Sequence, residues 1–522
     1  MKRKLSLILA LMMALSILPG LSLAETAERK TISIMCAEPT TLEDVETNYA
    51  TLYLEDRMNA DFTWSFLPAS EWTTKLELMI TANETLPDVL FGNLSELVVA
   101  KYGSNGTFID LTPYYDTSTH IKAGLEVDPN FRKMVTFADG KIYSVARLQQ
   151  ETHTEYGHKF FLNKTWLDNL GLAVPTTIDE FTEVLRAFRD QDANGNGDPS
   201  DEIPMTGTTS VQHTNPLLYL MGSFTFFDTG TYLQVNDGVV NVCYNTDGWR
   251  EGLRYFAGLY EEGLIDPLMF TQDLDQLKAV LQREGDTIAG AASGMNSSHV
   301  FSGNPKMLEY TGTTPFVGPD GTQYAPWQSY SVTHNGFITK DCADPQLAFD
   351  LLDLCWEKEA GMVIRYGEEG VDWEWAPEGT EGIYADVPAT FRLISDVQSG
   401  VQNKWWNVWS PLYLDYSIGD GRAKSDNPLD PSALAYATVP KLKGYIPEER
   451  VAKIIYTTEE SNEIAEIKSN LDSYWKEAMT LFIIGDMDIE SEWEDYLAEL
   501  ESIGLGRYLE VTQAAYTRVW GE

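Results

Sequence analysis

The chain of 522 residues is poor in cysteine, histidine and basic residues. It has 4 Cys and 6 His, with no CxxC pair and no His at zinc spacing, which argues against a zinc site and His-based catalysis. It has 37 Lys and Arg against 79 Asp and Glu, a net charge of −42. Nucleic-acid binders need a basic surface to displace counterions from phosphates, so the sequence excludes a general nucleic-acid-binding protein. The same charge disfavours docking on anionic lipid.

Long apolar runs are missing after the N-terminus, so we do not expect an integral membrane protein. The first residues have the pattern of a secretory signal: a basic start at Lys2, an apolar stretch over 5–18, and small residues at Ser22 and Ala24. A membrane anchor is the alternative, but the run is short for a span. We expect cleavage near Ala24 and an extracytoplasmic protein, periplasmic or secreted. No cysteine lies in or just after the signal, so a lipid-attached N-terminus is not expected.

The four cysteines are expected to be free, buried thiols. Cys342 lies just before a predicted helix over 345–358 and Cys355 lies near its end, which would hold them about 20 Å apart. A disulfide needs Cα atoms within about 7 Å.

Strand and helix patterns alternate at the start of the mature chain. Apolar or alternating runs at 31–36, 61–67 and 87–92 predict strands, and 48–59 and 72–82 have helical spacing. This order predicts a parallel, doubly wound sheet. Such sheets bind ligands at the carboxyl ends of their strands, where Glu38 and Asn93 lie. The chain is longer than a single hydrophobic core usually accommodates, so we expect at least two lobes. The Pro/Gly-rich stretch 313–327 is interpreted as a connection between them.

An acidic, Gly-rich loop at 190–202 predicts a calcium site. Its alternating Asp and Asn oxygens and its glycines suit a hard cation that takes six to eight oxygen ligands. Two registers fit, one starting at Asp190 with Gly195 at the bend, the other starting at Asp192 with Gly197 at the bend. The alternative is an acidic surface turn.

Tryptophan is concentrated late in the chain. Seven of the 14 tryptophans lie between 327 and 409, several beside Gly, Asp or Asn in loop-like sequence. Such residues suit stacking on sugar faces, although core packing is the alternative. The preferred candidates for a ligand site are Trp327, Trp373 and Trp406, opposite Glu38 and Asn93.

Catalytic motifs are absent from the sequence: it contains no GxSxG, HExxH or P-loop. Carboxylates are abundant, so a two-carboxylate glycosidase stays open as an alternative. A calcium-stabilised polysaccharide-binding surface protein is another.

Three blocks of the chain resemble the extracellular solute-binding protein family 1 of ABC importers, in particular its long subgroup with alginate-binding and LipO-type proteins. They are 161–204 with the acidic loop, 348–373, and 482–516. The resemblance implies a type II periplasmic-binding-protein-like α/β fold. Two lobes, each a doubly wound sheet with flanking helices, would meet at a hinge. It implies capture, not catalysis, of a solute for delivery to an ABC permease, and we expect the solute to be an oligosaccharide.

The resemblance also implies a domain plan and a ligand set for structural calcium. We expect a signal at 1–24, a first lobe from 28–150 with 330–385, and a second from 151–329 with 386–522. The implied calcium ligands favour the second register and are Asp192, Asn194, Asn196, Asp198 through its carbonyl, Asp201 and Glu202. Substrates in this family include neutral and uronate-bearing oligosaccharides and peptides, so the ligand class stays open. We expect a monomer.

Overall fold

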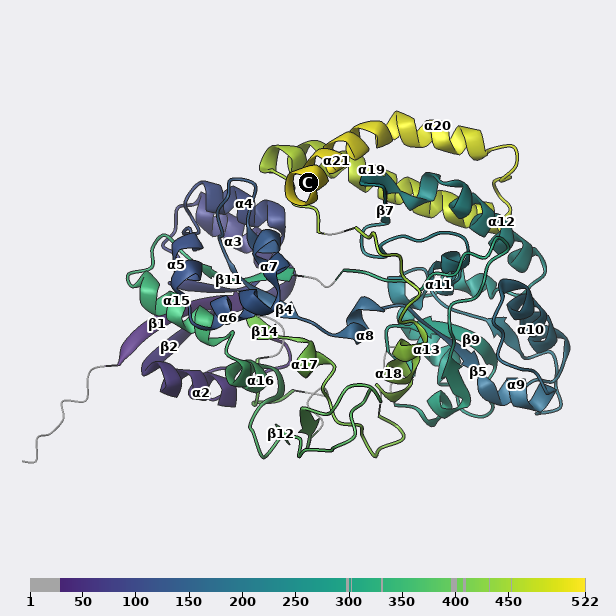
Figure 1. Ribbon diagram of the computed structural model, residues 1–522, viewed down its shortest axis with the longest axis horizontal. Helices are drawn as coiled ribbons and strands as arrows, with labels where there is room; N and C mark the ends of the chain where they lie inside the picture. The colour runs from purple at the N-terminus through teal and green to yellow at the C-terminus, as the bar shows by residue number, and fades with distance from the viewer. Residues whose placement is uncertain are drawn as a thin grey trace, which may run out of the picture.

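The computed structural model describes residues 29–296, 300–301, 303–329, 332–395, 401–406, 410–430, 432–451 and 453–521. The predicted signal at 1–24 lies outside the described residues. Two lobes lie side by side, each built on its own sheet, and a group of C-terminal helices lies along the second lobe (Figure 1).

The first lobe is built on a six-stranded sheet in the order β14-β4-β11-β3-β1-β2. Its strands are β1 (Lys30–Ala37), β2 (Ala60–Leu67), β3 (Val89–Leu94), β4 (Val145–Gln149), β11 (Val332–Ile338) and β14 (Leu412–Leu414). Five of them run in one direction and β11 runs in the other. The three strands predicted at the start of the chain are confirmed as β1, β2 and β3, with α2 (Tyr49–Met58) and α3 (Trp72–Thr81) between them.

The second lobe is built on a four-stranded sheet in the order β10-β5-β9-β6. Its strands are β5 (Lys159–Asn163), β6 (Ile203–Met205), β9 (Ala289–Gly294) and β10 (Tyr310–Gly312). The central strand β9 consists of Ala, Gly and Ser and is buried along its whole length. A Cβ added at Gly290 would lie 2.3 Å from the Phe188 ring, so the close packing of the helix on this sheet requires glycine there.

The three strands from which the sequence predicted a parallel sheet, β1, β2 and β3, are parallel. Each complete sheet, however, is mixed. β11 and β5 are the strands that run against their neighbours. Each is the first strand that the chain forms after crossing from the other lobe. Such a strand begins at the edge of the sheet that faces the other lobe. The other strands of the sheet end at that edge, so the strand that begins there runs in the opposite direction.

Helices cover both sheets (Figure 1). The helices of the first lobe are α2, α3, α4 (Glu96–Ser104), α5 (Thr112–Thr117), α6 (His120–Val127), α7 (Pro129–Val135), α15 (Pro345–Leu354) and α16 (Lys358–Tyr366). The helices of the second lobe include α9 (Lys164–Leu170), α10 (Ile178–Asp190), α11 (Pro216–Leu220), α12 (Asp247–Glu261), α13 (Leu274–Leu281) and α18 (Ala433–Thr438). The C-terminal helices are α19 (Thr458–Ile484), α20 (Trp493–Ile503) and α21 (Leu505–Trp520). The capping box that the sequence indicates at Thr177 and Glu180 is present at the start of α10.

The division of the chain at residue 386 is wrong in part. Phe391, Trp405, Trp406 and the strand β14 are buried in the core of the first lobe, not of the second. The reason is that β14 pairs with β4, which draws the preceding segment onto the first sheet. The chain passes to the second lobe only after this strand.

All four cysteines are free in the structure, as predicted. Cys36, Cys243 and Cys355 are buried, while Cys342 is only half-buried. Among the described residues, we find no helix that has both the length and the hydrophobicity to cross a membrane.

Candidate functional site

The two sheets present corresponding edges to the segments that join the lobes. In the first sheet, β4 ends at Gln149 and β14 ends at Leu414, and the chain leaves both for the second lobe. In the second sheet, β5 begins at Lys159, which pairs with Gly294 at the carboxyl end of β9. The carboxyl ends of β6, β9 and β10 therefore lie at the edge where β5 enters. Ligands of α/β sheets bind at such carboxyl edges, so the region between the lobes is the candidate site.

Segments that link the lobes meet at the carboxylate of Glu155. Glu155 ends α8 (Thr152–Glu155), between β4 and β5. Its carboxylate accepts hydrogen bonds from the Tyr416 hydroxyl and, at 3.4 Å, from the Trp327 indole N–H. The guanidinium of Arg450 lies 4.8 Å from the centre of the Trp327 ring. We call Glu155, Trp327, Tyr416 and Arg450 the hinge cluster: the first three come from different segments that cross between the lobes, and Arg450 comes from the segment that joins α18 to α19.

The hinge cluster combines a desolvated carboxylate with an accessible aromatic ring. Burial raises the pKa of Glu155, although the donors Tyr416 and Trp327 act in the opposite direction. Tyr416 begins α17 (Tyr416–Gly419) and is 38% exposed, whereas Trp327 is 7% exposed. α8 and α17 both lie between the two lobes (Figure 1). The cluster thus offers an aromatic face and hydrogen-bonding groups to a ligand between the lobes.

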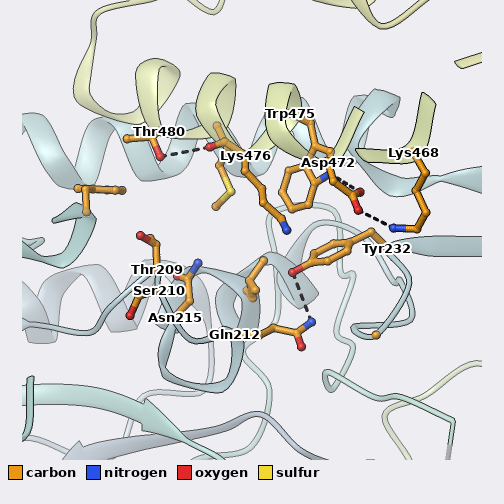
Figure 2. A pocket seen from close by; sticks show the side chains of 14 residues that line it. Thr209, Ser210, Gln212, Asn215, Tyr232, Lys468, Asp472, Trp475, Lys476 and Thr480 are labelled. Atoms are coloured by element: carbon orange, nitrogen blue, oxygen red, sulfur yellow. Dashed lines mark hydrogen bonds and ion pairs between the residues drawn. The ribbon is translucent and has the colours of Figure 1, made fainter. Parts of the chain in front are cut away.

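A cavity of about 420 Å³ lies in the second lobe beyond the carboxyl end of β6 (Figure 2). One side is a polar loop after β6, which contributes Thr209, Ser210, Gln212 and Asn215. The other side is α19, which contributes Lys468, Asp472, Trp475, Lys476, Met479 and Thr480. Hydroxyl, amide and aromatic groups in a concavity of this size suit a small polar ligand with apolar faces, such as a sugar residue.

Tyr232 stands between the loop and the helix, and its backbone is strained. Its φ of 59° lies in the left-handed region, which is rare for an aromatic residue. Its hydroxyl lies 3.3 Å from the Gln212 side-chain nitrogen, and its ring centre lies 4.5 Å from that of Trp475. Strain held in place by surrounding contacts is common at binding sites.

The cavity and the hinge cluster are neighbours. The carboxylate of Asp228 accepts hydrogen bonds from the backbone N–H of Gly230, which lines the cavity, and of Ser329, at 3.0 and 3.1 Å. The N–H of Gln328 in turn donates to the Glu155 carbonyl oxygen at 2.9 Å. The connecting segment that contains Gln328 and Ser329 therefore contacts both the edge of the cavity and the hinge cluster.

The predicted ligand-site residues divide into two groups. Glu38 and Asn93 are exposed at the carboxyl ends of β1 and β3, and Trp327 belongs to the hinge cluster. Trp373 and Trp406 are fully buried in the first lobe.

The two buried indoles have internal partners in place of a ligand. The Trp373 N–H donates to the Gly367 carbonyl oxygen and the Trp406 N–H to the Thr51 hydroxyl, both at 2.9 Å. Trp406 also packs against Phe91 of β3, with ring centres 5.7 Å apart. Neither ring has a face open to a ligand, so core packing, the alternative to stacking, describes these two.

Sequence reasoning missed Glu155, Tyr416, Arg450, Tyr232 and the cavity face of α19. No local motif marks them, because they come from segments far apart in the chain. Only the expectation that ligands lie beside the connecting segments could have pointed to Tyr416.

The acidic loop at 190–202 folds around its own side chains. Gly195 and Gly197 have φ values of 77° and 93°, which glycine adopts most readily. The Asp192 carboxylate accepts the Gly197 N–H at 2.9 Å, and the Glu202 carboxylate accepts the Ala193 N–H at 3.0 Å. The loop is therefore held in the register in which Gly197 makes the bend.

Two oxygens of this loop fit a cation. Oδ1 of Asp192 and Oε2 of Glu202 are buried and have no hydrogen-bond partner in the described part of the chain. The side-chain nitrogens of Asn194 and Asn196 lie 3.1 and 3.3 Å from Oδ1 of Asp201. Across the described residues, however, no three His, Cys, Asp or Glu side chains converge tightly enough to hold a metal by themselves. Any ion here would also need amide and carbonyl oxygens.

Comparisons with known proteins agree on one family. The profile of the bacterial extracellular solute-binding proteins matches residues 45–362. The chain is 25% identical to the fructooligosaccharide ABC transporter substrate-binding protein FusA of Streptococcus pneumoniae, over 94% of this chain and 90% of the relative.

Solved structures share the fold. The HMO-binding ABC-transporter-associated solute-binding protein of Bifidobacterium longum infantis matches with a TM-score of 0.79 and 21% identity, over 95% of this chain and 100% of that one. An EF-hand mutant of S. pneumoniae FusA in complex with fructo-nystose matches with a TM-score of 0.74 and 23% identity, over 94% and 99%.

Proposed function

We infer that this chain, which belongs to the bacterial extracellular solute-binding proteins, captures an oligosaccharide between its lobes and delivers it to the permease of an ABC importer. The observation that carries the proposal is the hinge cluster, where an exposed tyrosine and a half-buried carboxylate lie at the meeting point of the connecting segments. The named ligand of FusA is a fructooligosaccharide, which supports the same class here.

Capture requires that the ligand bind one conformation better than the other. A sugar stacked on Tyr416 and hydrogen-bonded to groups of both lobes would favour the closed form, because only that form offers all the contacts at once. Each stacked ring contributes about 1–3 kcal/mol, comparable to burying an apolar side chain. Glu38 and Asn93 would supply polar contacts from the first lobe, and the cavity would take one end of the oligosaccharide.

We propose a structural calcium ion in the loop at 190–202. The residues that would hold it are Asp192, Asn194, Asn196, Asp198 through its carbonyl, Asp201 and Glu202. The unpartnered oxygens of Asp192 and Glu202 support this proposal, as does the naming of an EF-hand in FusA. The amides of Asn194 and Asn196 can offer their oxygens after rotation. Bound calcium would neutralise part of the acidic loop and stabilise the folded state.

Export is part of the proposal. Residues 1–24 would direct secretion, with cleavage near Ala24, and the mature protein would act outside the cytoplasm as a monomer. Its partners would be the sugar and the transmembrane subunits of the importer.

A thermal-shift screen tests the main proposal. Neutral oligosaccharides such as kestose, uronate-containing oligosaccharides and peptides are each added to the purified protein. A rise in Tm with an oligosaccharide supports capture. Release of new reducing ends from the same sugar would instead identify a glycoside hydrolase, and stabilisation by peptides alone would contradict the sugar assignment.

A further inference from the structure

A half-buried ion pair joins the C-terminal part of the chain to the first lobe. The ammonium of Lys453 contacts the carboxylate of Glu96, the first residue of α4, and lies 3.3 Å from the Met134 carbonyl oxygen of α7. Nε2 of His334 lies 3.9 Å from the same carboxylate. Burial acts to raise the pKa of Glu96, but the nearby His334 and Lys453 outweigh it and lower the pKa to about 2.

The segment that carries Lys453 is held firmly to two C-terminal helices. The Trp520 indole N–H donates to the Lys453 carbonyl oxygen at 2.8 Å. The Arg518 guanidinium donates to the Ile455 carbonyl oxygen at 3.1 Å and pairs with Glu460 in the first turn of α19. Residues 453–457, the start of α19 and the end of α21 thus form one unit. We call residues 453–457 the strap.

α19 itself belongs to the second lobe. Its apolar face, which includes Leu471, Trp475 and Phe482, is buried in the core of that lobe. The same helix supplies one whole side of the cavity, with the Lys476 and Trp475 side chains directed toward Tyr232 (Figure 2). The strap leads directly into this helix, and about 15 Å of continuous helix separates Thr458 from Lys468 at the cavity.

We propose that Glu96 and Lys453 are positioning residues for the ligand cavity. Their ion pair connects the strap, and through it α19, which lines one side of the cavity, to the carboxyl edge of the sheet in the first lobe. The start of α19 also contacts α4. When the lobes change their spacing, the strap and this end of α19 must either follow the first lobe or separate from it. The pair therefore links the shape of the cavity to the separation of the lobes. This inference rests on the proposed function in one respect: it takes the cavity to be part of the ligand site.

The charge environment favours a specific role for this pair. In a chain with a net charge of −42, Lys453 is a half-buried cation placed against a carboxylate at a helix N-terminus. Because the contact depends on both charges, removing either side chain is expected to release it.

Hydrogen exchange on the ligand-free full chain tests the proposal. Glu96→Gln and Lys453→Met are compared with the wild type at the amides of 209–215 and 468–480, which line the two sides of the cavity. We expect exchange in both segments to rise about tenfold in each variant, within the usual range of coupling between sites. The charge-swapped double variant Glu96→Lys with Lys453→Glu should restore protection. The matched control is Lys424→Met, which breaks an exposed ion pair with Glu381 and should leave both segments unchanged.

The proposal is overturned if the folded variants exchange faster only at 453–457 while the cavity segments stay protected as in the wild type. The ion pair would then stabilise the strap alone and have no effect on the cavity. Should Lys453→Met fail to fold, Glu96→Gln and the charge-retaining Lys453→Arg give the same contrast. No sugar is added, so a failure of oligosaccharide capture would not alter this outcome.

Discussion

The two lobes use their aromatic residues differently. In the first lobe, Trp356, Trp373 and Trp406 are fully buried beneath or beside the sheet. The second lobe also buries tryptophans, but beside Trp475 it keeps a cavity, and it carries the acidic loop at its surface. The first lobe thus uses these tryptophans for core packing, whereas the second lobe combines a packed core with a cavity and an oxygen-rich loop. The lesson is that tryptophan in loop-like sequence reports on a binding site only when the tertiary structure leaves a face of the ring open.

Replacing a buried tryptophan of the first lobe should have the largest effect on stability. Trp406→Ala removes a fully buried indole and its hydrogen bond to Thr51, so we expect a loss of about 3–5 kcal/mol in the free energy of unfolding. Urea denaturation measures it. The control is Trp375→Ala, because that ring is 37% exposed and its loss should cost far less. Sugar affinity in the folded fraction of Trp406→Ala should be unchanged; a specific loss of affinity would return this residue to the ligand site.

Calcium should stabilise the second lobe by a somewhat smaller amount. With free calcium at about a hundred times its Kd, the gain is about 2.7 kcal/mol, and chelator should remove it. Asp192→Ala should abolish the difference in Tm between calcium and chelator. Asp190→Ala is the matched control: it should keep the difference in the register that begins at Asp192 and lose it in the register that begins at Asp190. Identical melting curves with and without chelator would contradict a calcium site.

Tyr416 should govern affinity and leave stability nearly unchanged. Tyr416→Ala removes an exposed ring, so we expect a loss of about 1–3 kcal/mol of binding energy, roughly a tenfold to hundredfold weaker Kd. Tyr416→Phe keeps the ring and removes the hydroxyl that donates to Glu155, so it should bind more tightly than the alanine variant. Calorimetry with the best sugar from the thermal-shift screen measures both. Equal affinity of all three proteins would exclude stacking at this position.

The smallest expected effect is a pH-dependent one at the junction of the lobes. The pKa of Glu96 is lowered in the folded state to about 2, so its ionised form stabilises the fold above its ordinary pKa of 4.5. This contribution should be lost as the pH falls from about 4.5 toward 2. Wild type and Glu96→Gln should therefore differ in Tm at pH 7 and converge in acid. A difference that stays constant down to pH 2 would show that the charge of Glu96 is not responsible.

Local signals in the sequence anticipated much of the first lobe. The runs at 31–36, 61–67 and 87–92 became β1, β2 and β3, because their apolar side chains match the faces of a buried sheet. The capping box at Thr177 and the bend at Gly197 were also visible, since both depend on residues a few positions apart. The position of β14 was not, because its assignment depends on pairing with β4, more than 260 residues earlier in the chain.

The sequence by itself determined the secretory pattern, the alternation of strands and helices, the family resemblance and the oxygen-rich loop, because composition and near-neighbour spacing carry each of them. Only the tertiary structure decided which aromatic rings are buried and which are open. It also decided that Glu155, Trp327, Tyr416 and Arg450 meet, and that Lys453 reaches Glu96. The physical reason is that these contacts join segments separated by up to hundreds of residues. Such contacts form through the packing of whole sheets and helices, for which no local pattern of residues is a substitute.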